Sequence, residues 1–314
     1  MRKYIISICL GMIFFSSCSN WLDVEPKTMV EEEELFSREL GFKEALTGLY
    51  IKMAQSSLYG EDLTIGFMDV LGQRYQNTTS DGYQNALWYS FPSTKTEKYT
   101  ERIWGNMYNL IANVNNLLYY CDAKKQVLTT ENYYEIIKGE ALGLRAFLHF
   151  DLLRIYAPSL AMNPGDRLFI PYVDKYPSYL SDRQTVGYCL ERIIADLVEA
   201  QKILKDVDKS SEFTSGNRFT KSPSGEERFV WYRGFHLNYH AVTAELARVY
   251  LYAGQSEKAY ETAKLLIDIN ADKGYYKAVT SSYSGPMNIE NGNIKMYEDI
   301  IFALYSTDQT DWDL

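Results

Sequence analysis

The sequence predicts a mainly α-helical fold, in which paired helices form degenerate repeats with long loop insertions and a few short strands. Apolar side chains recur every three or four residues over several long stretches, and this spacing places them on one face of a helix. The clearest pair covers residues 237–253 and 256–269. Gly254 can end the first of these helices in a left-handed conformation, and Ser256 can cap the second. Small side chains allow the two helices to approach closely, namely Ala244, Ala247, Ala259 and Ala263.

This helical hairpin resembles a tetratricopeptide unit. The segment Leu153–Tyr156 (LRIY) is echoed by Ala247–Tyr250 (ARVY) at a separation of 94 residues. That separation is not a multiple of the usual repeat of about 34 residues. We therefore expect tetratricopeptide-like repeats that are interrupted by insertions, and not a regular solenoid.

The other elements follow in chain order. A first helix or helix pair begins near Glu33, and its apolar face continues through Tyr50. The stretch 72–98 lacks periodicity and is rich in polar and loop-forming residues, so it is predicted to be a long surface loop. Helices are predicted at residues 101–120, 133–156 and 187–205, and Pro158 stops the second of them. We expect an extended segment at 168–173, a polar loop at 206–227 and a strand at 299–305.

Composition narrows the class of partner. The chain has 314 residues, of which 46% are hydrophobic, as in ordinary globular proteins. Its formal net charge is −9 with acidic residues spread along it, so no basic surface that could follow a nucleic-acid backbone is evident. The 27 Tyr, 14 Phe and 5 Trp suit partly apolar surfaces in contact with water, including surfaces that stack against sugars.

The N-terminus predicts export and a lipid anchor. Arg2 and Lys3 precede an apolar run at residues 4–15, which is shorter than a membrane span and typical of a signal peptide. Two serines then precede Cys18, as in a bacterial lipobox. The alternative is an ordinary cleaved signal with an incidental cysteine. We expect a signal peptide at 1–17, a tether lipidated at Cys18 over 18–32, and a helical-repeat domain at 33–314 that meets the membrane through the lipid alone.

Two further cysteines remain in the predicted mature chain. Cys121 and Cys189 both lie within apolar helical patterns, and two cysteines cannot form a disulfide framework. Buried free thiols are therefore predicted in preference to a single bridge.

The best candidate for ligand contact lies in the predicted loop at 72–98. Tyr83, Asn85, Trp88 and Tyr89 cluster there among polar residues. Aromatic rings offer sugars a flat apolar face, while amide groups can satisfy sugar hydroxyls. This cluster predicts a glycan-binding site. The alternative is that Trp88 and Tyr89 attach the loop to the core.

No metal, cofactor or catalytic site is predicted. His236 and His240 are four residues apart, which can place both imidazoles on one helical face, but no third ligand is evident, so surface or capping histidines are expected. His149 is expected to pack within the helix bundle. The sequence has no nucleophile elbow, P-loop or dinucleotide-binding glycine pattern. A secreted glycoside hydrolase stays open as an alternative, since paired catalytic carboxylates cannot be recognised from spacing alone.

Several segments carry a resemblance to a known family. They are Cys18 with the run WLDVEPK at 21–27, then residues 139–156, 185–197 and 247–254, and finally residues 298–303. In order and spacing these segments resemble the SusD/RagB family of outer-membrane nutrient-uptake lipoproteins. Members of that family usually continue well beyond the last of these segments, so we expect a C-terminally short form of the family's domain.

The resemblance implies a fold and a role. It implies a mostly helical, non-catalytic protein at the cell surface that binds oligosaccharide and delivers it to a TonB-dependent, SusC-like transporter in the outer membrane. In the family, aromatic residues just before the helix that matches 101–120 contribute to the glycan site. The alternative role is a structural partner or lid of the transporter without glycan affinity of its own.

Overall fold

A computed structural model describes residues 32–75, 81–91, 94–178, 180–208, 219, 228–276 and 299–306. The predicted signal peptide, Cys18 and nearly all of the predicted tether lie outside these residues, and so does most of the predicted loop at 206–227.

The described chain is mainly α-helical, as predicted. Its helices are α3 (Glu39–Met53), α4 (Phe67–Leu71), α5 (Asp81–Leu87), α6 (Thr94–Ala123), α7 (Tyr133–Tyr156), α8 (Val186–Leu204), α9 (Tyr239–Tyr252) and α10 (Ser256–Lys273). Two short strands, β1 (Ile170–Pro171) and β2 (Arg183–Gln184), pair antiparallel.

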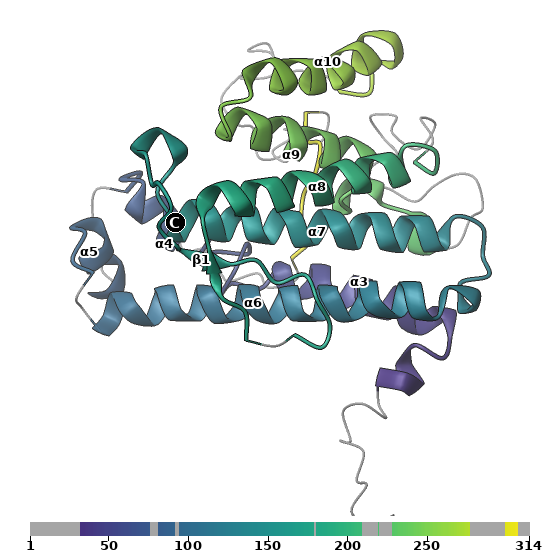
Figure 1. The fold of residues 1–314 in the computed structure, drawn as a ribbon, viewed down its shortest axis with the longest axis horizontal. Helices are drawn as coiled ribbons and strands as arrows, with labels where there is room; N and C mark the ends of the chain where they lie inside the picture. Colours follow the sequence, from purple (N-terminus) through teal and green to yellow (C-terminus); the bar gives the residue numbers. More distant parts are fainter. Residues whose placement is uncertain are drawn as a thin grey trace, which may run out of the picture.

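The long helices pack side by side as antiparallel neighbours. Figure 1 shows α6 and α7 adjoining, with α8, α9 and α10 following in chain order toward one edge, and helix contacts join each of these successive pairs. The hydroxyl of Tyr156, at the end of α7, donates to the Thr100 carbonyl near the start of α6 at 2.6 Å. At the other end, Tyr134 donates to Asp122 at 2.9 Å. These contacts fix α6 and α7 in opposite directions.

Helix α7 forms the centre of the core. It contacts α3, α6, α8 and α9, and 17 of its 24 residues are buried. Because most of its surface is covered, charged residues are buried with the apolar ones, and each needs a partner. Arg145 meets this need through two 2.7 Å hydrogen bonds to Asp196 on α8 and one of 3.0 Å to Asn115 on α6.

The predicted helices match the structure best where apolar periodicity is strong. Helix α7 has the predicted bounds, and α8 starts and ends within one residue of them. A helical segment at 32–35 precedes α3, so the predicted N-terminal helix pair is present. Gly254 follows α9 with a φ of +73°, as predicted. The predicted cap at Ser256 is wrong, because Gln255 occupies that position and makes no side-chain cap hydrogen bond.

The prediction of one long loop at 72–98 is wrong. Helix α5 lies within it, and α6 begins at Thr94, seven residues before the predicted start at 101. Helical segments in proteins gain most of their stability from tertiary contacts and not from propensity. A helix can therefore form there although the sequence has no apolar stripe. Ala86 and Thr96, both fully buried, mark those contacts.

The predicted extended segments are confirmed only in part. Of residues 168–173, only Ile170 and Pro171 form a strand. Residues 299–306 form no strand, so that prediction is wrong. The Ala303 amide donates to the Gly234 carbonyl at 3.0 Å, and the Phe302 ring lies 6.2 Å from Phe147. Phe302 therefore packs on α7, and the backbone of the segment bonds to Gly234 instead of joining a sheet.

The cysteines are buried and free, as predicted. Cys121 and Cys189 both have no exposed surface. Burial raises the pKa of each thiol to about 12, so both stay protonated and unreactive near neutral pH.

None of the helices described is both long and apolar enough to cross a bilayer. Among the same residues, no group of three or more His, Cys, Asp or Glu side chains is arranged to hold a metal ion.

The two echoed segments meet where α7 contacts α9. Arg154 lies 2.8 Å from Asp151 Oδ1, and Arg248 lies 3.8 Å from the same oxygen. Both guanidinium groups also lie against the ring of Phe150, at 5.7 and 5.2 Å from its centroid. Glu245, only 7% exposed, accepts a 3.1 Å hydrogen bond from Arg248. Charged groups of both helices therefore share one partly exposed cluster.

This cluster predicts a pH dependence of stability. Burial raises the pKa of the Glu245 carboxyl to about 7 from 4.5, although Arg248 lowers it, and Asp151 raises it further. Because the folded pKa is the higher one, the stability from this group is full below about pH 4.5 and is lost as the pH rises to about 7. The Glu245→Gln variant stays neutral. When the pH is raised from 5 to 8, its free energy of unfolding should therefore rise by about 1–3 kcal/mol relative to that of the natural protein.

Urea unfolding at pH 5 and at pH 8 measures this change in the free energy of unfolding. Glu261→Gln, at an exposed position on α10, serves as the control and should follow the natural protein. Parallel pH profiles of the Glu245→Gln variant and the natural protein would contradict the prediction.

Candidate functional site

Three aromatic side chains lie exposed at one end of the helix bundle. Trp88 is 72% exposed, Tyr89 55% and Phe91 48%. They follow α5, which packs against the start of α6, at the end of the bundle seen in Figure 1. We call Trp88, Tyr89 and Phe91 the aromatic surface. Exposed apolar groups gathered within four residues are typical of a binding surface.

The backbone of the aromatic surface is held by the last turn of α5. The amides of Trp88, Tyr89 and Ser90 donate to carbonyls of residues 84, 86 and 85, at 3.3, 3.0 and 2.8 Å. Tyr89 has a φ of +52°, a left-handed conformation that is uncommon for a bulky residue. Such a conformation persists only where the surrounding contacts enforce it. The turn that displays the rings is therefore a fixed feature of the fold.

Two side-chain hydrogen bonds attach this turn to the end of α4. Gln73 Nε2 donates to the Leu87 carbonyl at 2.7 Å. The hydroxyl of Tyr89 donates to the Leu71 carbonyl at 3.0 Å. The ring of Tyr89 lies 6.3 Å from that of Phe91. One face of Tyr89 is thus available at the surface while its hydroxyl serves as an attachment.

The structure separates the four predicted contact residues. Trp88 and Tyr89 lie together at the surface, and Asn85 is half-buried beside them on α5. Tyr83 turns inward instead. Its hydroxyl donates to Glu61 Oε1 at 3.1 Å, and its ring lies 5.3 Å from that of Tyr99. The alternative that these two residues attach the segment to the core fits the hydroxyl of Tyr89, whereas most of the Trp88 side chain faces solvent.

Sequence reasoning missed two members of this region. Phe91 belongs to the aromatic surface, and its position three residues after Trp88 in the run WYSF was the available signal. Tyr75 is also 41% exposed, and its hydroxyl donates to the Ile65 carbonyl at 2.8 Å. Nothing in the local sequence distinguishes Tyr75 from other loop tyrosines.

Two carboxylates that contact α5 and α6 are already engaged. Asp62 is 1% exposed and forms an ion pair with Arg102. Burial raises the pKa of Asp62, although Arg102 acts against this shift. Burial, together with the charges of Glu61 and Asp62, raises the pKa of Tyr83 well above its usual value. Tyr83 therefore stays protonated and can donate to Glu61 at any physiological pH.

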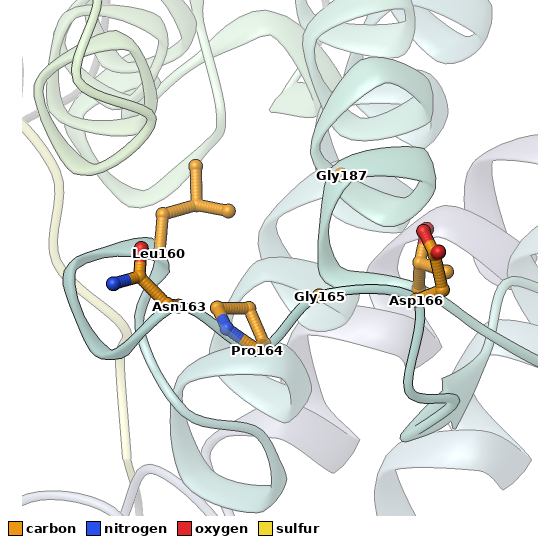
Figure 2. A pocket seen from close by; sticks show the side chains of 7 residues that line it. Leu160, Asn163, Pro164, Gly165, Asp166 and Gly187 are labelled. Carbon is orange, nitrogen blue, oxygen red and sulfur yellow. The ribbon is translucent and has the colours of Figure 1, made fainter.

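A separate shallow hollow lies between the loop that follows α7 and the start of α8. It has a volume of about 420 Å³ and is lined by Leu160, Asn163, Pro164, Gly165, Asp166, Thr185 and Gly187 (Figure 2). No aromatic side chain lines it, and Thr185 already accepts a hydrogen bond from the Tyr188 amide at 3.2 Å. The aromatic surface is therefore the better candidate for ligand contact.

The histidines act within the core. His149 is fully buried among the helices, as predicted, and burial lowers its pKa to about 3, so it is neutral. The expectation of surface or capping histidines at 236 and 240 is wrong. His236 lies 2.9 Å from Glu140, and the buried His240 lies 2.8 Å from the Tyr276 hydroxyl. Because α9 begins at Tyr239, the two imidazoles do not share a helical face.

Comparison with known proteins identifies the family. The model of the SusD-like family described as "Starch-binding associating with outer membrane" matches residues 20–224, which is more than half of the chain. The chain belongs to the SusD-like family. The matched part includes the aromatic surface and helices α3 to α8.

Individual SusD-like relatives agree in sequence and fold. The SusD-like protein P2 of Formosa agariphila is 23% identical over 86% of this chain and 47% of its own length. A SusD superfamily protein of Bacteroides vulgatus has a TM-score of 0.60 at 22% identity, over 79% of this chain and 51% of its own. A SusD-like carbohydrate binding protein of the same species has a TM-score of 0.55 at 19% identity, over 81% and 49%. The chain thus spans about half the length of these SusD-like proteins.

Proposed function

We propose that this SusD-like protein binds oligosaccharide for nutrient uptake at the outer membrane and delivers it to a TonB-dependent, SusC-like transporter. The observation that carries the proposal is the aromatic surface on a fixed turn. The family model describes starch binding and association with the outer membrane, and one related structure is named a carbohydrate binding protein. Both descriptions support a carbohydrate ligand.

The chemistry of the aromatic surface fits a sugar. The C–H faces of a pyranose ring are apolar, and they pack against an exposed aromatic ring such as Trp88. Gln84 is exposed and Asn85 half-exposed in the preceding turn, and amide groups can both donate to and accept from sugar hydroxyls. A surface that combines rings with amides suits a neutral, hydroxyl-rich ligand better than a charged one.

The proposal assigns no catalytic activity. Glycoside hydrolysis requires two carboxyl groups that are free to act on the glycosidic bond. Glu61 and Asp62, in the turn that receives the Tyr83 side chain, are held by Tyr83 and Arg102 respectively. These carboxylates therefore serve the fold.

The geometry also suits a lipid anchor at Cys18. The described chain starts beside the end of α6, where Glu33 pairs with Lys124 and the Phe36 ring stacks on Tyr120 at 4.4 Å. The aromatic surface lies at the other end of α6, a helix of 30 residues, which is about 45 Å long. An anchor that joins the domain at residue 32 would leave the aromatic surface distant from the attachment point (Figure 1).

Affinity gel electrophoresis tests the proposed function. Residues 19–314 are run through native gels that contain a panel of polysaccharides, and release of reducing ends is monitored in parallel. We expect retardation by at least one polysaccharide without release of sugar. Release of reducing ends would instead support the hydrolase, and absence of retardation across the panel would support a transporter partner without glycan affinity.

A further inference from the structure

The short helix α5 determines where the aromatic surface lies. It has seven residues, whereas an isolated helix needs about 12–15 residues to be even marginally stable in water. The conformation of α5 must therefore come from its contacts with the rest of the protein. Among its side chains, Ala86 is fully buried and Tyr83 makes a polar contact with another segment.

Tyr83 joins α5 to the turn that precedes α4. Its hydroxyl donates to Glu61 at 3.1 Å, and its ring packs against Tyr99 and Phe67 at 5.3 and 6.4 Å. Gly66 provides the space for this contact, because a Cβ atom at that position would lie 2.8 Å from the Tyr83 hydroxyl. The turn is therefore shaped to receive this side chain.

The adjacent residue joins the same turn to α6. Asp62, which is buried, pairs with Arg102, and the Arg102 guanidinium lies 4.8 Å from the centroid of the Tyr99 ring. The Asp62 amide donates to the Ser56 carbonyl at 2.9 Å. Two consecutive carboxylates thus link three segments, since Glu61 holds Tyr83 on α5 while Asp62 holds α6 and also interacts with the Tyr83 hydroxyl.

We propose that Tyr83 and Glu61 are positioning residues that set the orientation of α5 and so the placement of Trp88, Tyr89 and Phe91. The role of Tyr83 and Glu61 in ligand binding rests on the proposed function, whereas their control of α5 does not. Tyr83 acts through the rings that follow it and does not contact the ligand. Tyr83 and Trp88 therefore have different roles, although they lie only five positions apart in one segment.

Hydrogen–deuterium exchange without ligand tests the control of α5. Tyr83→Phe removes one hydroxyl and keeps the ring. We expect exchange of residues 81–91 to rise about fivefold, the effect of one net hydrogen bond on a local opening equilibrium. Glu61→Ala should give an increase no larger than that of Tyr83→Phe, because the Tyr83 hydroxyl also interacts with Asp62. The double variant should exchange no faster than Tyr83→Phe alone, because both changes act on the same hydroxyl. Glu61→Gln, which retains an acceptor oxygen, should stay near the natural rate.

Tyr134→Phe provides the matched control. It also removes a tyrosine hydroxyl that donates to a carboxylate at 2.9 Å, but at the opposite end of α6. It should leave exchange of residues 81–91 unchanged. Unchanged exchange in Tyr83→Phe, or additive effects in the double variant, would overturn the proposal.

Glycan affinity supplies the second measurement. Tyr83→Phe and Glu61→Ala should weaken binding by a similar factor, about fivefold, if one hydrogen bond underlies both effects. Weaker binding by Tyr83→Phe with unchanged exchange would mean that Tyr83 contacts the ligand, and it would overturn the positioning role. If the natural protein binds no glycan, the proposed function fails, while the exchange result still decides whether Tyr83 and Glu61 control α5.

Discussion

Replacement of Glu140 by alanine is expected to lower the free energy of unfolding by about 3–5 kcal/mol, since it breaks a buried ionic network. Glu140 on α7 has no exposed surface. It accepts hydrogen bonds from Tyr50 at 2.7 Å and from Arg233, and it lies 2.9 Å from His236. Alanine would leave these three groups without their shared acceptor.

The network joins distant parts of the chain. Tyr50 belongs to α3, and its hydroxyl accepts from the Leu237 amide at 2.8 Å. Arg233, 3% exposed, also pairs with Asp208 at 2.8 Å. Burial alone would raise the pKa of Glu140, but Arg233 and His236 outweigh it and hold that pKa at about 2. The carboxylate therefore stays charged near neutral pH.

Urea unfolding of three variants measures the contribution of this network. Glu140→Gln keeps acceptor capacity but loses the charge, so its loss should be smaller than that of Glu140→Ala. Glu191→Ala, at an exposed position on α8, should change the free energy of unfolding by no more than about 0.5 kcal/mol. A loss below about 1 kcal/mol for Glu140→Ala would contradict the structural role of the network.

Replacement of Trp88 by alanine is expected to weaken glycan binding by about tenfold, or about 1.4 kcal/mol, since the apolar face of the sugar loses the ring against which it packs. Because the Trp88 side chain is 72% exposed, the melting temperature should change little. Isothermal titration with the polysaccharide that retards the natural protein measures the affinity. Loss of affinity without loss of stability distinguishes a ligand contact from a structural role.

Tyr260→Ala is the matched control for Trp88. Tyr260 lies on α10 and is 67% exposed, so its replacement also removes an exposed ring. Its affinity for glycan should equal that of the natural protein. Equal glycan affinity in Trp88→Ala and Tyr260→Ala would show that Trp88 does not contact the glycan.

Much of the fold follows from periodicity in the sequence. The apolar stripe of α7 and the proline at 158 predicted its bounds, because both effects are local. Helix α5 was missed because its stability comes from contacts such as the one between Tyr83 and Glu61, 22 residues apart in sequence. The alternation of residues 299–305 predicts a strand, although the same pattern also suits an extended segment that packs on helices.

The candidate site was predictable in part. An aromatic cluster in a polar stretch identified Trp88 and Tyr89, because such clusters are unusual in surface loops. The inward direction of Tyr83 depends on the partner that its hydroxyl finds in the folded protein, and spacing does not contain this information. The partner of Glu140 could not be predicted for the same reason, since Arg233 lies 93 residues away in sequence.

The most direct test of the account is the location of bound glycan on the protein. Hydrogen–deuterium exchange of the natural protein is measured with and without the polysaccharide that retards it. We expect slower exchange at residues 84–91, centred on the turn that carries Trp88 and Tyr89. Protection confined to α10, or to the hollow at 160–166 and 185–187, would contradict it.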